Sequence, residues 1–370
     1  MATIFTGAVN SNWNNAGNWS GGSIPTSTDD VQFNSSSPSC TIDYGTGNNE
    51  CLKLDFTGYT STITFNYDLT SRGDVTLSSS GMFFSGSATL RVGAGGTQTL
   101  TSNGTTLGVT LALAGSGSST IDLADNWTVD SLYIASGVTF IIDGGGNTIT
   151  VLTSFTSPAG NYIIEGNGTG SSSITIVLGG PTSSAVTWDG TIIGTNATLD
   201  IDTSGTVTIN NVECDGGTIK YTSGSVSCGT GTLTVIKGTL DTGGMGTTTN
   251  PWYDVTSANS SQTVTLDSDL YVGNNFTVGG STGTVIFNQD TTETIYVAGD
   301  LIVGSGGGIK GTATIVLVTT TSPNAWTGQW SSAGPGGIVQ NNMIVYSCNS
   351  RAFISGTQVY YEEGLLTMYA

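Results

Sequence analysis

The chain has 370 residues, of which 55 are glycine, and only 9% are charged. Its 26 acidic and 7 basic residues give a net charge of −19, which argues against nucleic acid and anionic membrane surfaces as partners, because both require clusters of Lys and Arg. Hydrophobic residues reach 36% and Thr, Val and Ile are abundant, so we expect pleated sheet and not a disordered chain. There is no histidine, which removes the commonest general base and most zinc sites.

Residues 1–35 differ in composition from the rest of the chain. They hold Trp13 and Trp19 in an Asn/Gly-rich frame, followed by Pro25 and a short strand at 31–33. We predict an N-terminal cap in which both indole rings cover the first coil and their N–H groups find partners at its rim. The alternative is a Trp-lined surface that binds a carbohydrate or a protein. The first residues after Met1 lack the basic and apolar regions of a signal peptide, and no stretch approaches membrane-spanning length.

The pattern W-N-x-x-x-N-W-S-G-G-x-x-P-x-x-x-D-D-V-x-F at 13–33 resembles the opening of many β-helical surface proteins. These include haemagglutinin- and autotransporter-like bacterial adhesins and virion proteins of tailed phages. Later phrases of the type Leu-x-x-Asp-Leu-x-Val are similar to the coil repeats of these proteins. The resemblance implies a β-helix in an extracellular or virion setting, and it transfers no catalytic residue.

Residues 36–318 read as continuous coils. Apolar residues alternate with period two, as at Trp127 and Val129, and glycine, serine, asparagine or aspartate separates the runs. The pattern of 121–155 is written again at 264–303, which is typical of stacked repeats. We therefore predict an all-β fold, a right-handed parallel β-helix (β-solenoid). A string of β-sandwiches is the rival. Trp188 and Trp252 interrupt the pattern and are expected on loops that stand off the coil.

Residues 319–370 form the third predicted region. Trp326 and Trp330 lie among prolines and small residues, and Tyr360 and Tyr361 lie in an apolar strand. We predict a C-terminal β cap or subdomain, which would blunt an open sheet edge. The alternative is a docking or oligomer-forming tip. The candidate contacts with a partner or a glycan are therefore Trp13, Trp19, Trp326, Trp330, Tyr360 and Tyr361.

A β-helix can also carry lyase or hydrolase chemistry, which requires a basic residue or a pair of carboxylates. The basic residues are scattered singly, although Lys220 and Lys237 are spaced to stack on one face as a solvated pair. Asp200 with Asp202, and Asp267 with Asp269, would share one face of a strand as hydrolytic carboxylates or a weak Ca²⁺ site. Such D-x-D pairs beside Thr and Ser are common in β-helix turns. We predict no catalytic residue, no cofactor and no metal.

Five cysteines are present without a C-x-x-C motif, which makes a metal knuckle improbable. Cys40 with Cys51, and Cys214 with Cys228, are spaced to meet on neighbouring turns. Buried reduced thiols are the equal alternative.

These observations together predict a structural virion protein of a tailed bacteriophage: a capsid decoration, head fibre or tail-associated fibre. It would act as a rigid scaffold, located in the virion, with other virion proteins, sister subunits of a homo-oligomer and a cell-surface glycan as partners. The alternatives are a bacterial surface adhesin of the β-helix type and a β-helix polysaccharide lyase or hydrolase.

Overall fold

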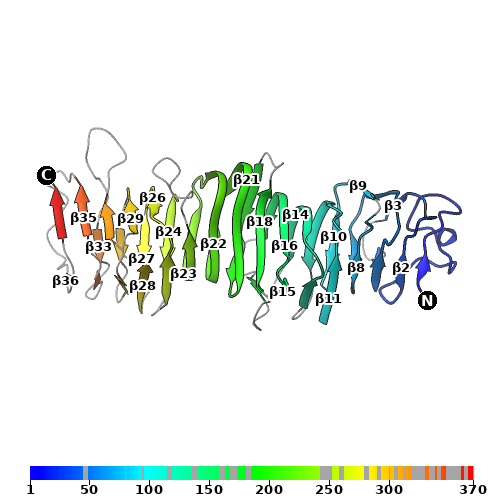
Figure 1. Cartoon of the computed structure of the whole chain (residues 1–370), viewed down its shortest axis with the longest axis horizontal. Helices are drawn as coiled ribbons and strands as arrows, with labels where there is room; N and C mark the ends of the chain where they lie inside the picture. Colours follow the sequence, from blue (N-terminus) through cyan, green and yellow to red (C-terminus); the bar gives the residue numbers. More distant parts are fainter. Residues whose placement is uncertain are drawn as a thin grey trace. The chain divides into compact units, whose positions relative to one another are not determined.

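The structure is a computed structural model of the whole chain. It describes residues 1–370 with these exceptions: 45–48, 80, 94–95, 115–118, 136–139, 158–162, 167–172, 181–184, 242–251, 258–261, 279–282, 290–292, 300, 304–306, 312–313, 318–329, 333–337, 340–342, 347–359, 362–365 and 370. The chain forms two compact units, Met1–Thr191 and Ile192–Ala370. Apart from the 3-10 helix η1 (Ala16–Asn18), the regular elements of the described residues are β-strands (Figure 1). No helix among them is long and apolar enough to cross a membrane.

Unit 1 is built from columns of parallel strands, each strand pairing with its counterpart one rung later. The first column runs β1 (Thr3–Ile4), β2 (Asp30–Gln32), β5 (Lys53–Asp55), β8 (Val75–Thr76), β11 (Gly96–Thr101), β13 (Ser119–Leu123), β15 (Phe140–Asp143) and β17 (Ile163–Gly166). The second holds β3 (Cys40–Ile42), β6 (Thr62–Phe65) and β9 (Phe83–Gly86). The third runs β4 (Glu50–Cys51), β7 (Leu69–Ser71), β10 (Thr89–Val92), β12 (Leu107–Ala114), β14 (Trp127–Ala135) and β16 (Thr148–Thr156), and ends on β18 (Ile174–Gly180) and β19 (Ala185–Asp189).

Unit 2 follows the same plan. It opens with β20 (Ile192–Gly194) and the long strands β21 (Ala197–Ile209), β22 (Val212–Ser227) and β23 (Thr232–Asp241). From β23 one column continues through β24 (Asp254–Ser257), β27 (Phe276–Val278), β30 (Leu301–Val303) and β33 (Trp330–Ser332). Another runs through β25 (Thr263–Leu266), β28 (Gly283–Gln289), β31 (Gly307–Gly311), β34 (Ile338–Val339) and β36 (Tyr360–Tyr361). A separate sheet holds β26 (Leu270–Val272), β29 (Thr294–Val297), β32 (Thr314–Leu317), β35 (Met343–Tyr346) and β37 (Leu366–Tyr369).

The alternating side chains produce this stacking. Along β6, Ile63 and Phe65 are fully buried, while Thr62 and Thr64, which alternate with them, are half-buried. Each strand therefore turns one row of side chains inward, and the rows of successive rungs stack to form the core of the solenoid. The predicted all-β solenoid is confirmed. The rival string of β-sandwiches is wrong, because sandwiches pair their strands antiparallel.

Two local expectations are wrong. Trp188 and Trp252, expected on stand-off loops, are fully buried. Trp188 belongs to β19, and Trp252 forms a parallel bridge with Val272. In both places a large aromatic residue replaces a smaller core residue without breaking the ladder, so the departure in composition reflects core filling.

The described strands of the C-terminal region stack on the coil. Within 319–370 the described strands β33 to β37 pair in parallel with the preceding rungs, as Leu301 with Trp330 and Ile315 with Met343. In these strands the parallel stacking continues past residue 318, and the C-terminal cap or docking tip stays a prediction.

Candidate functional site

The two tryptophans of the N-terminal motif lie inside unit 1. Trp13 is 0% exposed and Trp19 is 3% exposed. Their rings meet edge to face with centroids 4.7 Å apart, and the Trp19 indole N–H donates to the Trp13 carbonyl oxygen at 2.8 Å. The Trp13 indole nitrogen has no hydrogen-bond partner among the described residues. Neither ring presents a face on which a sugar could stack, so their burial favours the capping interpretation.

The remaining aromatic candidates lie in the C-terminal region. Trp326 falls outside the described residues. Trp330 begins β33, and Tyr360 and Tyr361 form β36, whose backbone pairs with Ile338 and Val339. Contact of these four residues with a partner or a glycan stays a prediction.

The scarce basic residues are used between rungs. Each basic side chain that the structure describes forms an ion pair with an acid on a neighbouring rung. The pairs are Lys53–Asp74 at 2.7 Å, Arg72–Glu50 at 3.0 Å, Arg91–Asp68 at 2.8 Å, Lys220–Asp200 at 3.0 Å and Lys237–Asp215 at 3.5 Å. These ion pairs therefore link neighbouring rungs and favour their observed register.

The expected stacking of Lys220 on Lys237 is wrong. In the ladder Lys220 lies opposite Asp200 and Asp241, while Lys237 lies opposite Asp215. A rung in this part of unit 2 is longer than the spacing between the two lysines. Each lysine therefore meets a carboxylate and avoids like-charge repulsion.

The candidate hydrolytic pair Asp200 and Asp202 is engaged by the next rung. The Asp200 carboxylate accepts from Lys220 Nζ at 3.0 Å and from Thr222 Oγ1 at 2.7 Å. Asp202 accepts from Ser223 Oγ at 2.6 Å. Both carboxylates thus serve as inter-rung acceptors, and this geometry gives no reason to assign them a reaction.

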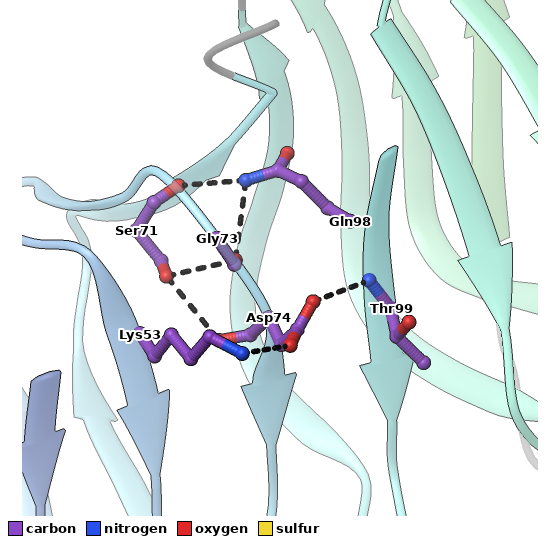
Figure 2. A network of polar contacts seen from close by, with 6 residues as sticks. All are labelled: Lys53, Ser71, Gly73, Asp74, Gln98 and Thr99. Atoms are coloured by element: carbon purple, nitrogen blue, oxygen red, sulfur yellow. Dashed lines mark hydrogen bonds and ion pairs between the residues drawn. The ribbon is translucent and has the colours of Figure 1, made fainter. Parts of the chain in front are cut away.

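Figure 2 shows one of these inter-rung networks, at one corner of unit 1. Asp74 precedes β8 and lies between Lys53 on the rung before and Thr99 on the rung after. It accepts from Lys53 Nζ at 2.7 Å and from the Thr99 backbone N–H at 3.0 Å. Burial alone raises the pKa of Asp74, but the hydrogen bonds from Lys53 and Thr99, with the charge of Lys53, lower it overall. The hydrogen bond to Asp74 and its charge raise the pKa of Lys53.

A buried amide closes the inner side of the same corner (Figure 2). Gln98 is 1% exposed, and its Nε2 donates to the Gly73 carbonyl at 3.1 Å and the Ser71 carbonyl at 3.4 Å. Ser71 Oγ also donates to the Gly73 carbonyl, at 3.1 Å. Turn carbonyls that point into the core need such donors, because an unpaired buried carbonyl is costly. Gln98 thus occupies a core position to satisfy the turn of the preceding rung.

Asx capping of the next rung recurs in both units and was not predicted from the sequence. An Asp or Asn immediately before a buried strand residue accepts from the backbone N–H that stacks on it one rung later. The side chain supplies an acceptor at the point where the lower rung is still turning. The bonds run from Thr89 to Asp68 at 3.0 Å, Thr99 to Asp74 at 3.0 Å, Thr148 to Asn126 at 3.0 Å, Thr232 to Asn211 at 3.2 Å, Asn275 to Asp254 at 2.9 Å and Thr294 to Asp269 at 2.7 Å.

A sequence signal for these caps does exist. In each case Asx is followed directly by an apolar residue at or near the start of a strand, as in Asp68-Leu69 and Asn126-Trp127. The repeated Asp-Leu phrase was visible as a repeat, but its role depends on which backbone N–H lies above it. Asp269, a candidate hydrolytic carboxylate with Asp267, is one of these caps.

Two carboxylates lie next to each other on the first column of unit 1. Asp122 and Asp143 are register partners on adjacent rungs. Burial first, and then the charges of Asp143 and Asp74, raise the pKa of Asp122. No group of three or more His, Cys, Asp or Glu able to hold a metal occurs among the described residues. The juxtaposition is a local electrostatic cost, and it assembles no metal centre.

A pair of stacked tyrosines lies on the separate sheet of unit 2. The rings of Tyr271 and Tyr296, register partners in β26 and β29, stack with centroids 4.4 Å apart and planes at 7°. Burial is the main cause that raises the pKa of Tyr271. The pair adds aromatic stacking between rungs.

The cysteines that the structure describes are free and buried: Cys40, Cys51, Cys214 and Cys228. Neither of the two cross-turn disulfides considered above forms, which leaves the alternative of buried thiols. Burial raises the pKa of Cys51, Cys214 and Cys228 to about 12 each, so their reactive thiolate forms are scarce at neutral pH.

No protein family, curated protein or solved structure matches this chain.

Proposed function

We propose that this protein is a non-enzymatic structural protein of a tailed-phage virion, a capsid decoration or fibre component that works as a stiff scaffold. One observation carries the scaffold role: every described basic side chain is committed to an acid on a neighbouring rung. A chain with so few cations would keep some of them free if it had to bind a polyanion or abstract protons.

The polar groups support the same role. Inter-rung Asx caps recur in both units, and buried amides such as Gln98 satisfy turns of the preceding rung. These contacts resist slippage of one rung past the next, and a solenoid that acts as a rigid scaffold requires such resistance. The virion setting comes from the resemblance of the motif at 13–33, with which the solenoid fold is compatible.

The setting is tested by fractionating cultures of the source organism and quantifying the protein by mass spectrometry. If it belongs to a virion, it bands with phage particles in a density gradient at a fixed ratio to the major capsid protein. Recovery with the cell envelope, in the absence of particles, would instead indicate the surface adhesin.

The non-enzymatic role is tested separately with purified protein and a panel of neutral and uronate-containing polysaccharides. We expect no new reducing ends and no unsaturated uronate absorbance over prolonged incubation. Turnover that Asp200→Asn or Asp267→Asn abolishes would refute the proposal.

A further inference from the structure

The free edge of the first strand of unit 1 is occupied by the chain itself. The Phe5 N–H donates to the Gln32 carbonyl oxygen on β2. The N–H and carbonyl groups of Ile4 therefore point to the opposite side of β1. The Ile4 N–H donates to Ser20 Oγ at 2.9 Å, and the Ser20 N–H donates to the Ile4 carbonyl at 2.9 Å. Phe5 and Trp19 complete an antiparallel bridge. The edge of β1 is thus closed by a segment that runs against the direction of the column.

The second column is closed by another part of the same loop. Thr41 in β3 donates its N–H to the Ser11 carbonyl at 2.7 Å and accepts from the Trp13 N–H at 2.8 Å. The Asn14 N–H donates to the Asp43 carboxylate at 3.0 Å. These bonds take the place that a preceding rung would have on β3.

One buried side chain shapes this loop. Asn18 is 0% exposed. Its Oδ1 accepts from the N–H groups of Val9 at 2.9 Å and Asn10 at 3.0 Å. Its Nδ2 donates to Asn10 Oδ1 and to the Asn12 carbonyl, both at 2.7 Å. Asn18 thereby uses both donors and two acceptor positions of its amide within the loop.

The loop also covers apolar surface. Phe5, Trp13, Trp19 and Phe33 are each between 0% and 3% exposed and pack ring against ring. Removing the loop would uncover the Phe33 ring together with the edges of β2 and β3. Parallel strand edges beside an apolar surface form a template for association with another chain.

We infer that residues 3–20 are a built-in plug that occupies an axial docking surface of unit 1 and keeps a second copy of this chain from associating there. The antiparallel course of residues 19–20 supports blocking at β1, whereas at β3 the loop forms a single parallel bridge, between Asn12 and Thr41. Ser20, Gly21 and Gly22, at the end of this segment, are exposed and too short a run to template a strand. Two unplugged copies would meet through the same surface, in an isologous dimer.

The test starts from the folded full chain with a specific protease site placed at the exposed residues 21–23. After cleavage, the N-terminal peptide is removed under mild denaturant and the protein is returned to buffer. Sedimentation velocity is expected to show a doubling of mass. Adding back a synthetic peptide of residues 2–21 is expected to restore the monomer, while a scrambled peptide does not. A stripped protein that keeps its circular dichroism spectrum and remains monomeric would overturn the inference.

Two substitutions make the result specific. Thr41→Pro removes the outward N–H of β3, so the stripped Thr41→Pro protein is expected to dimerise at least tenfold more weakly. Equal dimerisation would show that the edge is not the docking surface. If the stripped chain unfolds, the inference is tested with Asn18→Ala in the uncut chain, which removes the buried amide that shapes the loop. Faster hydrogen exchange at Ile4 and Thr41 together with concentration-dependent dimers supports the plug, and faster exchange in a strictly monomeric protein refutes it.

Discussion

At the scale of single residues, this protein spends polar side chains on the contacts between successive rungs. Asp74 joins three rungs by accepting from Lys53 before it and Thr99 after it. The two interactions differ in kind, since the first is an exposed ion pair and the second satisfies a backbone donor. Substitutions that separate them should therefore differ in cost.

We expect Asp74→Asn to destabilise unit 1 by no more than about 1 kcal/mol, because it loses only the exposed ion pair and keeps an acceptor for Thr99. Asp74→Ala should cost about 1 kcal/mol more, since the Thr99 N–H loses its partner. Urea unfolding and hydrogen exchange at the Thr99 amide measure both variants. Equal losses would show that the backbone acceptor contributes nothing.

The lowered pKa of Asp74 also sets a pH dependence. The stabilisation is present above the ordinary carboxyl pKa of 3.8 and is lost as the pH falls through the lowered folded value. Asp74→Asn should remove this loss, so the stabilities of the two proteins converge in strong acid.

The pH dependence of stability that Asp122 contributes has the opposite sign. Its pKa is raised by burial and by its neighbours Asp143 and Asp74, so the folded state binds the proton more tightly than the unfolded state. The charged form therefore costs stability at neutral pH, and that cost disappears as the pH falls toward the unfolded pKa. Asp122→Asn should raise stability at neutral pH, by at most about 1 kcal/mol, with little gain below the ordinary carboxyl pKa of 3.8. Denaturant midpoints at the two pH values check this, and a variant less stable at neutral pH would contradict it.

At the scale of elements, Asx residues at or just before the start of a strand help to hold the register of the next rung. In unit 2 the Asp254 carboxylate accepts from the Asn275 N–H and from Asn274 Nδ2, both at 2.9 Å. These bonds fix β27 against β24 at the end where the turn has not yet become a strand. Hydrophobic alternation prevents a slip by one residue, and the Asx cap opposes slips that preserve the alternation.

Asp254→Ala should destabilise unit 2 by about 1–3 kcal/mol, because the Asn275 N–H loses its acceptor. Asp254→Asn is the matched control, since it keeps the acceptor and removes only the charge. The expected local signature is faster hydrogen exchange at Asn275 in the alanine variant. An alanine variant as stable as the asparagine variant would argue that water replaces the cap at no cost.

At the scale of the whole molecule, electrostatics is dominated by a net charge of −19. The five ion pairs of the described residues are mostly exposed and contribute about 0–1 kcal/mol each. Repulsion among the surplus carboxylates acts throughout the chain and is screened by salt.

We therefore expect added sodium chloride to raise the midpoint of thermal unfolding by a few degrees. The expected gain comes from screened repulsion that exceeds the weakened ion pairs. Calorimetry over a salt series measures it, with sucrose as a control for general solute effects. A midpoint that falls with salt would mean that the inter-rung pairs outweigh the repulsion.

The fold could be predicted from the sequence because its signal is local. Alternation such as Ile63 and Phe65 within one strand, repeated with Gly- and Asx-rich breaks, requires stacked strands wherever the rungs begin and end. The expectation that Trp188 and Trp252 leave the coil was wrong, because composition does not show whether a large ring fits the core. For the same reason, composition does not show whether Trp13 and Trp19 cap the first coil or line a binding surface.

The amino-acid sequence by itself determined that the chain is all-β, that its strands repeat, and that its few cations are scattered. Only the tertiary structure decided which residues meet across rungs: Lys220 with Asp200, Asp74 with Thr99, and Ser20 with Ile4. The reason is that alternation along a strand depends on neighbours two residues apart, whereas these contacts depend on the length of each rung. The length of a rung varies with its turns, because turns tolerate insertions that leave the pattern of the strands unchanged.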